Sequence, residues 1–396
     1  ERIAKALEVG NDLSGTVDFL LDDRSDSDEI WDTPLSTKRT KLGYLEALQD
    51  FIGNIIEPQL PDLGLTVSRN KSVLHQIVRI YKNPQIEFGA PLNVQFISSG
   101  VYEQGIDAGG LTRDLFNLLM NEIAHSSFNG IKLFEGEMGH MLPVPNYDLV
   151  SGHFFEMVGK MILYAVINKC KGVKGISPTA IKYILSGNRE SELDDVTIED
   201  IPDPCLRQNL IELLECADSD LGKFMDRSQD CHLADLLTTS GFPHLEITAS
   251  NRRLAYECIL THGVITKRVI VLDDPRKGLS AVTSFRTSIV NLADEYRSIR
   301  ELVFPDKDGV INLDELMQLI EYDVTEDIDK SFAKDNMKCY IDVLAKRGSS
   351  EEKLHDLLLF WTAWPGLPPM NEKLKVGFLP NQPDKVLAVA DACFIY

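Results

Sequence analysis

The stretch "VQFISSGVYEQGIDAGGLTRDLFNLLMNEI" (residues 94–123) carries the clearest change of periodicity in the chain. Its first part alternates, because polar residues separate Val94 from Phe96, and this alternation predicts a half-buried strand over residues 92–100. Two glycines then interrupt the pattern before apolar residues of helical period begin. The stretch therefore predicts a strand, a tight turn and a helix in succession.

Residues 106–125, which extend past the end of this stretch, turn through two glycines into the predicted helix. Thr112 stands near its start, and threonine is a residue type whose hydroxyl caps free backbone amides, so we expect Thr112 to be the N-cap. Apolar residues spaced by three and four positions lie on one face of a helix. The residues that we expect to face the interior are Leu115, Leu118, Leu119 and Ile123.

Two other stretches show the same spacing. "KLGYLEALQDFIGNIIEPQL" (41–60) predicts an amphipathic helix that is stopped by Pro58. "YDLVSGHFFEMVGKMILYAVINK" (147–169) is apolar on nearly every side, which predicts one helix buried in the centre of a large lobe.

The remaining segments are shorter or more polar. Residues 1–65 differ in character from the rest of the chain, because residues 18–32 are acidic and serine-rich, which favours a solvated loop or a docking segment. Residues 176–268 predict short helices joined by turns. Residues 321–336 are polar, and we expect an exposed connection between domains there.

Composition restricts the class of protein. The chain has 396 residues, and 40 Lys and Arg against 61 Asp and Glu give a formal net charge of −21. Such a charge disfavours binding to nucleic acid or anionic lipid, so we expect basic or apolar protein partners. No apolar run is long enough to span a membrane, and the first residues lack the apolar centre of a secretion signal. We therefore expect a cytoplasmic or nuclear protein.

Seven cysteines are scattered without a C-x-x-C pair. The odd number and the spacing argue against a disulfide framework and against a zinc site, and most such cysteines are small buried hydrophobic residues. Cys393 stands in "LAVADACFIY" (387–396), between small residues and an aromatic residue. By itself this context leaves a packing residue, a disulfide half, a metal ligand and a nucleophile as alternatives.

The segment "FPDKDGVINLDEL" (304–316) imitates a calcium-binding EF-hand loop. Asp306, Asp308 and Glu315 fall at ligand positions of such a loop, but Phe304 occupies the first one, where a carboxylate belongs. A helix–turn–helix with an Asp-Gly turn explains the pattern as well. We expect no metal and no cofactor, and a calcium-responsive interaction protein is kept as a minor alternative.

Together these pieces resemble the HECT family of ubiquitin ligases. The stretch at 94–123 is similar to the family's strand, Asp-x-Gly-Gly turn and Thr-Arg-x-x-Phe helix start, with Asp107, Thr112, Arg113 and Phe116 in register. Four more stretches, in family order, are "HFFEMVGKMILYAV" (153–166), "VTIEDIPDPCLRQNLIELLE" (196–215), "FWTAWPGLPP" (360–369) and "LAVADACF" (387–394).

The resemblance implies an α+β, bilobal fold with a large, mainly helical N-lobe and a small α/β C-lobe joined by a hinge. It places the N-lobe at about 66–325 and the C-lobe at 326–396, after an N-terminal extension over 1–65. A subdomain at about 205–280 would bind the ubiquitin-conjugating enzyme. The implied partners are this enzyme, ubiquitin and protein substrates.

The resemblance also implies that Cys393 is the nucleophile, which holds ubiquitin as a thioester before its transfer to a substrate lysine. Asp391, Phe394 and Thr362 are candidate supporting residues. Asp391 stands where the family often has His, so its charge either disfavours the thiolate or serves to orient or deprotonate the incoming lysine.

Several positions depart from the family pattern. Ala392 replaces a Thr whose hydroxyl could steady the thioester, Ala388 replaces a Pro, and Ala363 replaces the Gly of Phe-x-Thr-Gly. The family also continues well beyond its cysteine, whereas three residues follow Cys393 here. The sequence also begins at Glu1 rather than Met. From these two observations we expect the chain to be a fragment of a longer protein. The alternative is a degenerate HECT-like scaffold that binds ubiquitin or the conjugating enzyme without chemistry.

Overall fold

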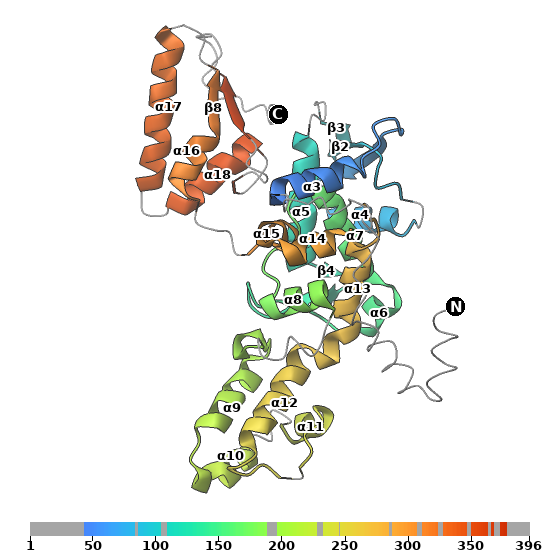
Figure 1. Ribbon diagram of the computed structural model, residues 1–396, viewed down its shortest axis with the longest axis vertical. Coiled ribbons are helices and arrows are strands. Elements are labelled where there is room, and N and C mark those ends of the chain that lie inside the picture. Colours follow the sequence, from blue (N-terminus) through green and yellow to red (C-terminus); the bar gives the residue numbers. More distant parts are fainter. Residues whose placement is uncertain are drawn as a thin grey trace, which may run out of the picture. The chain divides into compact units, whose positions relative to one another are not determined.

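The computed structural model describes residues 43–83, 86–103, 109–187, 196–227, 233–244, 246–284, 287–306, 311–323, 328–346, 350–362, 366–367 and 373–377. Within these ranges helices predominate and the sheets are small, so the fold is α+β, as predicted (Figure 1). None of the helices in these ranges has both the length and the apolar character needed to cross a bilayer. The predicted acidic segment at 18–32 lies outside the described residues.

The first helix, α3 (Tyr44–Gly53), buries Leu48, Phe51 and Ile52. The predicted helix over 41–60 is therefore present, but it ends ahead of Pro58, because glycine and asparagine are weak helix formers and stand at Gly53 and Asn54. Its apolar face belongs to the same core as the later helices α5 and α7. Residues 43–65 of the predicted extension thus pack with the rest of the chain.

A 3-stranded sheet comes next, made of β1 (Leu63–Ser68), β2 (Leu92–Ser98) and β3 (Val101–Tyr102). β1 and β2 are parallel and are connected through α4 (Val73–Tyr81), whereas β2 and β3 form an antiparallel hairpin. The strand predicted over 92–100 is confirmed. Its alternation has the expected cause, because Val94 and Phe96 are fully buried while their neighbours face outward.

Helix α5 (Gly110–His125) begins earlier than predicted. The N-cap is Gly109, with φ of +100°, which glycine adopts without the steric cost that a side chain would add. The prediction of Thr112 as the N-cap is therefore wrong, and Thr112 is instead a buried residue of the first turn. Of the residues predicted to face inward, Leu115, Leu119 and Ile123 are buried, and Leu118 is half-buried.

The helix predicted over 147–169 is two helices, α6 (Tyr147–Ser151) and α7 (Phe154–Ile167). His153 has φ of +49° and interrupts the helical backbone after Gly152, which apolar periodicity alone does not reveal. α7 is buried along almost its whole length, so the predicted central position is confirmed.

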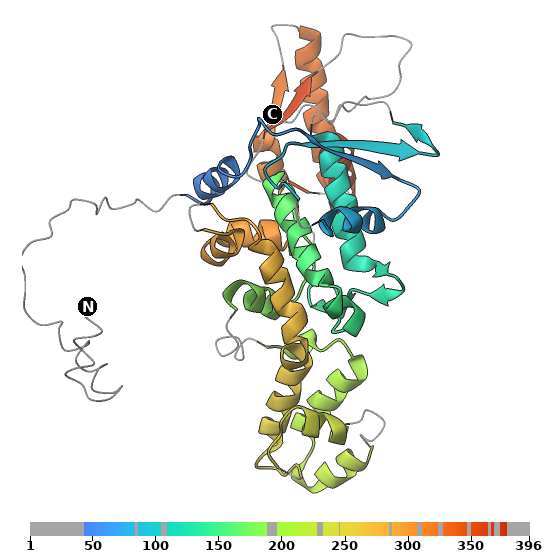
Figure 2. The ribbon, with the colours of Figure 1, turned by 90° about the vertical axis from the view of Figure 1, so that its right-hand side faces the viewer.

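Helix α13 (Val269–Leu279) packs against α7, and the two run side by side in both views (Figures 1 and 2). Their backbones touch at Gly159 and Gly278. A Cβ added to Gly278 would lie 2.1 Å from the carbonyl oxygen of Glu156, so no larger residue fits there without a backbone shift. Gly159 is the glycine of the stretch 153–166, and its close helix contact gives that motif a physical reason.

The rest of the main core consists of short elements. Buried apolar residues from Leu48 to Phe304 make one continuous cluster, which extends into the helices of residues 204–264; we call the part of this cluster outside residues 204–264 the main core. Its remaining elements are β4 (Ser127–Phe128), β5 (Ile131–Lys132), β6 (Phe134–Glu135), β7 (Leu142–Pro143), α8 (Pro178–Ser186), η2 (Ile198–Asp200), η5 (Thr266–Arg268), α14 (Ile289–Glu295) and α15 (Arg297–Val303).

Short helices between η2 and η5 form what we call the α9–α12 subdomain, residues 204–264. Their presence confirms the short helices predicted over 176–268. Apolar residues of α9 and α12, among them Leu210, Leu213 and Ile259, are fully buried there. The elements are α9 (Pro204–Glu215), η3 (Asp218–Asp220), α10 (Leu221–Arg227), α11 (Leu233–Thr239) and α12 (Arg252–Val264).

A second, separate apolar cluster lies in residues 311–377, which we call the C-terminal unit. Its strands pair in parallel, with Ile320 opposite Leu374. Leu316, Ile341 and Leu358 are buried at its centre. The elements are α16 (Leu313–Leu319), β8 (Ile320–Asp323), α17 (Ile328–Lys346), α18 (Ser350–Thr362) and β9 (Leu374–Gly377).

The exposed connection predicted over 321–336 is wrong in its position. β8 occupies its start, and α17 covers its second half from Ile328 onward. The polar composition misled the prediction because β8 is short and buries Ile320, just before the polar stretch. The main core ends at Phe304 and the second cluster begins with Ile311, so the connection between the two clusters falls within the EF-hand-like segment instead.

Candidate functional site

Of the four predicted site residues, the structure describes Thr362. Cys393, Asp391 and Phe394 lie outside the described residues, which end at 377. Thr362 is the last residue of α18 and is 2% exposed. Its hydroxyl donates a hydrogen bond to the carbonyl of Leu358, with 2.7 Å between the oxygens, so this buried hydroxyl has its partner within its own helix.

The main-chain carbonyl of Thr362 connects two of the motifs. It accepts a hydrogen bond from Nε of Arg113 on α5, at 3.0 Å. Arg113 belongs to the Thr-Arg pair of the stretch 94–123, and Thr362 to "FWTAWPGLPP", which is 249 residues away along the chain. The structure therefore brings together two motifs that the sequence analysis singled out separately.

Lys171 makes a second contact of the same kind. Its Nζ, just after α7, lies 3.4 Å from the carbonyl oxygen of Leu367. Hydrogen bonds donated by cationic groups are stronger than neutral ones, and both contacts act on main-chain atoms, which carry no side-chain specificity. Arg113 and Lys171 thus bond Thr362 and Leu367 of the C-terminal unit to the main core.

The α9–α12 subdomain presents apolar residues to solvent. Leu214 on α9 is 41% exposed and Leu254 on α12 is 40% exposed, although neighbouring leucines of the same helices are buried. Scattered exposed apolar residues are ordinary at protein surfaces, so the exposure of Leu214 and Leu254 does not by itself mark a binding site. What makes these two residues of interest is that both lie in the α9–α12 subdomain.

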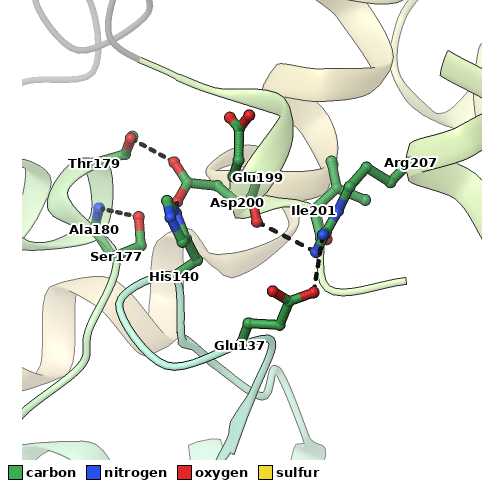
Figure 3. A network of polar contacts seen from close by, with 9 residues as sticks. All are labelled: Glu137, His140, Ser177, Thr179, Ala180, Glu199, Asp200, Ile201 and Arg207. Atoms are coloured by element: carbon green, nitrogen blue, oxygen red, sulfur yellow. Dashed lines mark hydrogen bonds and ion pairs between the residues drawn. The ribbon is translucent and has the colours of Figure 1, made fainter. Parts of the chain in front are cut away.

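A network of polar contacts lies where the chain enters the α9–α12 subdomain (Figure 3). Asp200, in η2, is 1% exposed, and its carboxylate accepts a hydrogen bond from the Thr179 hydroxyl at 2.8 Å. The other carboxylate oxygen lies 2.8 Å from Nδ1 of His140. An ionised carboxylate can only accept hydrogen bonds, so Nδ1 of His140 is the donor in this contact. A buried carboxylate needs such partners, because desolvation without them is costly.

Arg207 on α9 joins the same network (Figure 3). Its guanidinium donates to the carbonyl of Ile201, with Nη2 at 2.8 Å, and to the carboxylate of Glu137, with Nη1 at 2.9 Å. The carboxyl of Glu199, close by, has its pKa lowered, chiefly by a hydrogen bond from its own backbone amide. The start of α9 is therefore bonded both to its own preceding segment and to the loop after β6.

The chain returns from the subdomain past Arg268, in η5, whose side chain is fully buried. Its Nε donates to the carbonyl of Pro143 at 3.1 Å, and the other guanidinium nitrogens contact the carbonyl of Gly263 and the carboxylate of Glu135. Burial lowers the pKa of Arg268, and the Glu135 carboxylate opposes that shift. Arginine stays protonated in proteins, so this is a buried cation with a partner.

Sequence reasoning missed most of this network. Asp200 and Arg207 lie inside the quoted stretch 196–215, but nothing in their spacing points to His140 or Glu137, because the partners come from distant parts of the chain. No pattern in the sequence indicated that Arg268 would be buried or would bond to the hairpin of β6 and β7.

The cysteines differ from expectation at one position. Cys205 on α9 is disulfide-bonded, whereas Cys170, Cys216, Cys258 and Cys339 form no disulfide. Among these four, Cys170 is buried and Cys339 is exposed. Within the described part of the chain no three His, Cys, Asp or Glu side chains gather as metal ligands would.

Comparison with protein families gives one match. A family model described as HECT-domain (ubiquitin-transferase) matches residues 117–396, which is more than half of the chain. The match begins inside α5 and includes the α9–α12 subdomain, Thr362 and Cys393, while Arg113 lies just ahead of it. The sequence has no match among curated proteins.

Proposed function

The chain belongs to the HECT family of ubiquitin transferases, and on that basis we propose that Cys393 accepts ubiquitin from a conjugating enzyme and passes it to a substrate lysine. The strongest support is that the family match continues to the last residue and so includes this cysteine and its surroundings. The resemblance of "LAVADACF" (387–394) to the family's cysteine motif points to the same atom.

The first step is an exchange of thioesters. The thiolate of Cys393 attacks the carbonyl carbon of ubiquitin's C-terminal residue, a new C–S bond forms, and the bond to the conjugating enzyme's cysteine breaks. That cysteine leaves as a thiolate, so charge is conserved and the exchange is nearly neutral in energy. Ala388, Ala390 and Ala392 are small, which leaves room for the tail of ubiquitin.

The second step forms an amide. The lysine amine attacks the same carbonyl carbon, a C–N bond forms, and Cys393 leaves as a thiolate. The amine loses a proton in this step, and Asp391, two positions before the cysteine, is the candidate acceptor. A carboxylate at this position suits the second step better than the first, where a negative neighbour disfavours the thiolate.

We assign docking of the conjugating enzyme to the α9–α12 subdomain. Leu214 and Leu254 offer apolar contacts there, and the net charge of −21 favours a partner with a basic face. The sequence places this region at about 205–280, and the packing of α13 against α7 in the main core supports an end of the proposed docking region at α12.

We also propose that the two lobes move relative to one another, with the chain passing from the first apolar cluster, which ends at Phe304, to the second, which begins with Ile311. The C-terminal unit must move if Cys393 is to meet both the docked enzyme and a substrate. The bonds from Arg113 and Lys171 allow such movement, because a hydrogen bond of this kind contributes only about 1–3 kcal/mol.

A thioester experiment tests the proposal. The full chain is incubated with activating enzyme, conjugating enzymes, ATP and ubiquitin, and the products are separated without reductant. We expect an adduct that thiols cleave, that disappears in Cys393→Ala, and that becomes thiol-resistant in Cys393→Ser, because serine forms an oxygen ester.

Cys339→Ala is the matched control, since Cys339 is a free, exposed cysteine of the C-terminal unit. An adduct that survives Cys393→Ala but is lost in Cys339→Ala contradicts the assignment of the nucleophile.

A non-catalytic scaffold is the second candidate, and Ala392 favours it because the Thr hydroxyl of the family pattern is missing. This function predicts no adduct with any conjugating enzyme, together with binding of ubiquitin or of the conjugating enzyme in a calorimetric titration. Ala392→Thr separates the two candidates further, since it raises the rate of adduct formation in a transferase and leaves a scaffold unchanged.

A further inference from the structure

The chain passes twice between the main core and the α9–α12 subdomain, and the two passages touch. The outgoing passage is residues 196–203, and the return passage is the end of α12 with η5. Ile201, on the first, is 1% exposed. A Cβ added to Gly263, on the second, would lie 2.8 Å from Cδ1 of Ile201, so the two segments are in close contact.

One hairpin bonds both passages. We call residues 134–143, which contain β6, β7 and the loop between them, the clasp hairpin. It contacts the outgoing passage and α9 through His140 with Asp200 and through Glu137 with Arg207. It contacts the return passage through Glu135 and the carbonyl of Pro143, both bonded to Arg268.

The clasp hairpin is itself fixed to the main core. The carbonyl of Gly175 accepts hydrogen bonds from the amides of Gly139 and Met141, at 3.0 and 3.1 Å. Leu142 is fully buried, and the ring of Phe134 packs edge-on against Phe155 of α7, with centroids 5.7 Å apart. Contacts made by the hairpin are therefore contacts to the rigid part of the molecule.

We propose that the clasp hairpin sets the orientation of the α9–α12 subdomain on the main core, with Glu135, Glu137 and His140 as positioning residues. This rests on the proposed function, because the orientation matters through the conjugating enzyme that the subdomain carries. Two adjacent chain passages, together with apolar contacts that tolerate sliding, leave a subdomain free to change its orientation. Bonds from the hairpin to both passages and to α9 remove that freedom.

The hydrogen bonds between the clasp hairpin and its partners are of a kind that can fix an orientation. Each joins a charged or polar group of the hairpin to a charged side chain of the passage or of α9, and such bonds require a defined geometry, unlike apolar contacts, which tolerate sliding. Asp200 and Arg268, the partners on the passages, are both buried, so neither charge can be satisfied by water if the subdomain turns away.

A distance measurement on the full chain tests the orientation. Spectroscopic labels are carried by noncanonical residues at Tyr147 on α6 and Lys223 on α10, whose side chains are both mostly exposed. We expect one narrow distance distribution in the parent chain and a broader, shifted one in E135Q/E137Q. E257Q/E301Q removes the same two charges from exposed pairs within single helices and is expected to leave the distribution unchanged.

Transfer kinetics give a second readout. In E135Q/E137Q we expect the rate of transfer from the charged conjugating enzyme to fall by about 10- to 100-fold, because misplacement by about 1 Å can cost a factor of about 100. KM for the conjugating enzyme should not change, because its docking surface is intact. A loss of folding in the subdomain would raise KM instead.

The outcomes are distinguishable. A distribution that stays narrow in E135Q/E137Q, and also in H140Q, overturns the proposal whatever the activity. If E135Q/E137Q does not fold, H140Q alone decides, since it removes one bond and leaves the others. A broadened distribution in a chain whose parent forms no ubiquitin adduct supports the clasp and contradicts the proposed function.

Discussion

Two parts of the molecule meet the main core through bonds of different kinds. The α9–α12 subdomain is joined through buried charged side chains, Asp200 and Arg268, which have partners on the clasp hairpin. The C-terminal unit is joined through Arg113 and Lys171, which bond to main-chain carbonyls in part-buried positions.

This contrast suggests that the two attachments differ in how easily they open. Breaking a bond to a buried charge leaves that charge in a poorly solvated place, whereas a part-buried carbonyl that is released can bond to water. The first attachment is therefore costly to open and the second is easily reversed. This fits the proposal that the subdomain docks the conjugating enzyme in a fixed orientation and that the C-terminal unit moves together with the proposed nucleophile Cys393.

Arg268 should be the most sensitive position. Arg268→Met leaves two main-chain carbonyls and the 38%-exposed Glu135 carboxylate without their buried donor, and loss of the partner of a buried polar group costs about 1–3 kcal/mol for each carbonyl. We expect the free energy of unfolding in urea to fall by this amount. Arg297→Met is the control, because Arg297 is 83% exposed in a pair within α15, and its unfolding curve should stay close to that of the parent. Equal losses in the two variants would contradict the contrast between buried and exposed charges.

Asp200→Ala should come next. It removes the bonds of the Asp200 carboxylate to the Thr179 hydroxyl and to Nδ1 of His140, and loss of a hydrogen bond to a buried charged group costs about 1–3 kcal/mol. Urea denaturation measures this loss. Asp62→Ala, at an exposed loop position, should stay within about 0.5 kcal/mol of the parent. An unchanged free energy of unfolding in Asp200→Ala would show that the network contributes nothing to holding the subdomain.

Arg113→Met combined with Lys171→Met should affect the C-terminal unit more than the main core. We expect a loss of about 1–3 kcal/mol in the attachment, seen as faster hydrogen exchange of amides in α18, with unchanged exchange in α7. Arg79→Met, an exposed arginine on α4, is the control. Faster exchange throughout the molecule would mean that these bonds support the whole fold, and the two attachments would then no longer differ in kind.

Glu137→Gln alone should change stability least. Its side chain is 68% exposed, so the bond to Arg207 is partly screened by solvent and contributes about 0–1 kcal/mol. We expect a melting temperature close to that of the parent. A large loss would indicate that the clasp hairpin stabilises the fold rather than orients the subdomain.

Apolar periodicity predicted the existence and type of the long elements. It identified β2, α3, α5 and α7, because burial of one face is decided by residues close together in the chain. It failed at Gly109 and His153, where backbone conformations in the left-handed region set the helix starts. It also failed at β8, whose pairing partner β9 is more than fifty residues away.

Residue type and local spacing were enough to predict the helices, the mixed fold, the acidic character and the family. Neither could predict that Arg113 meets Thr362 or that His140 meets Asp200, which are consequences of tertiary packing. Such contacts join residues from distant segments, and their partners become fixed when the main core places both segments at hydrogen-bonding distance. The way in which the subdomain and the C-terminal unit are attached is therefore a property of the packed fold rather than of any motif.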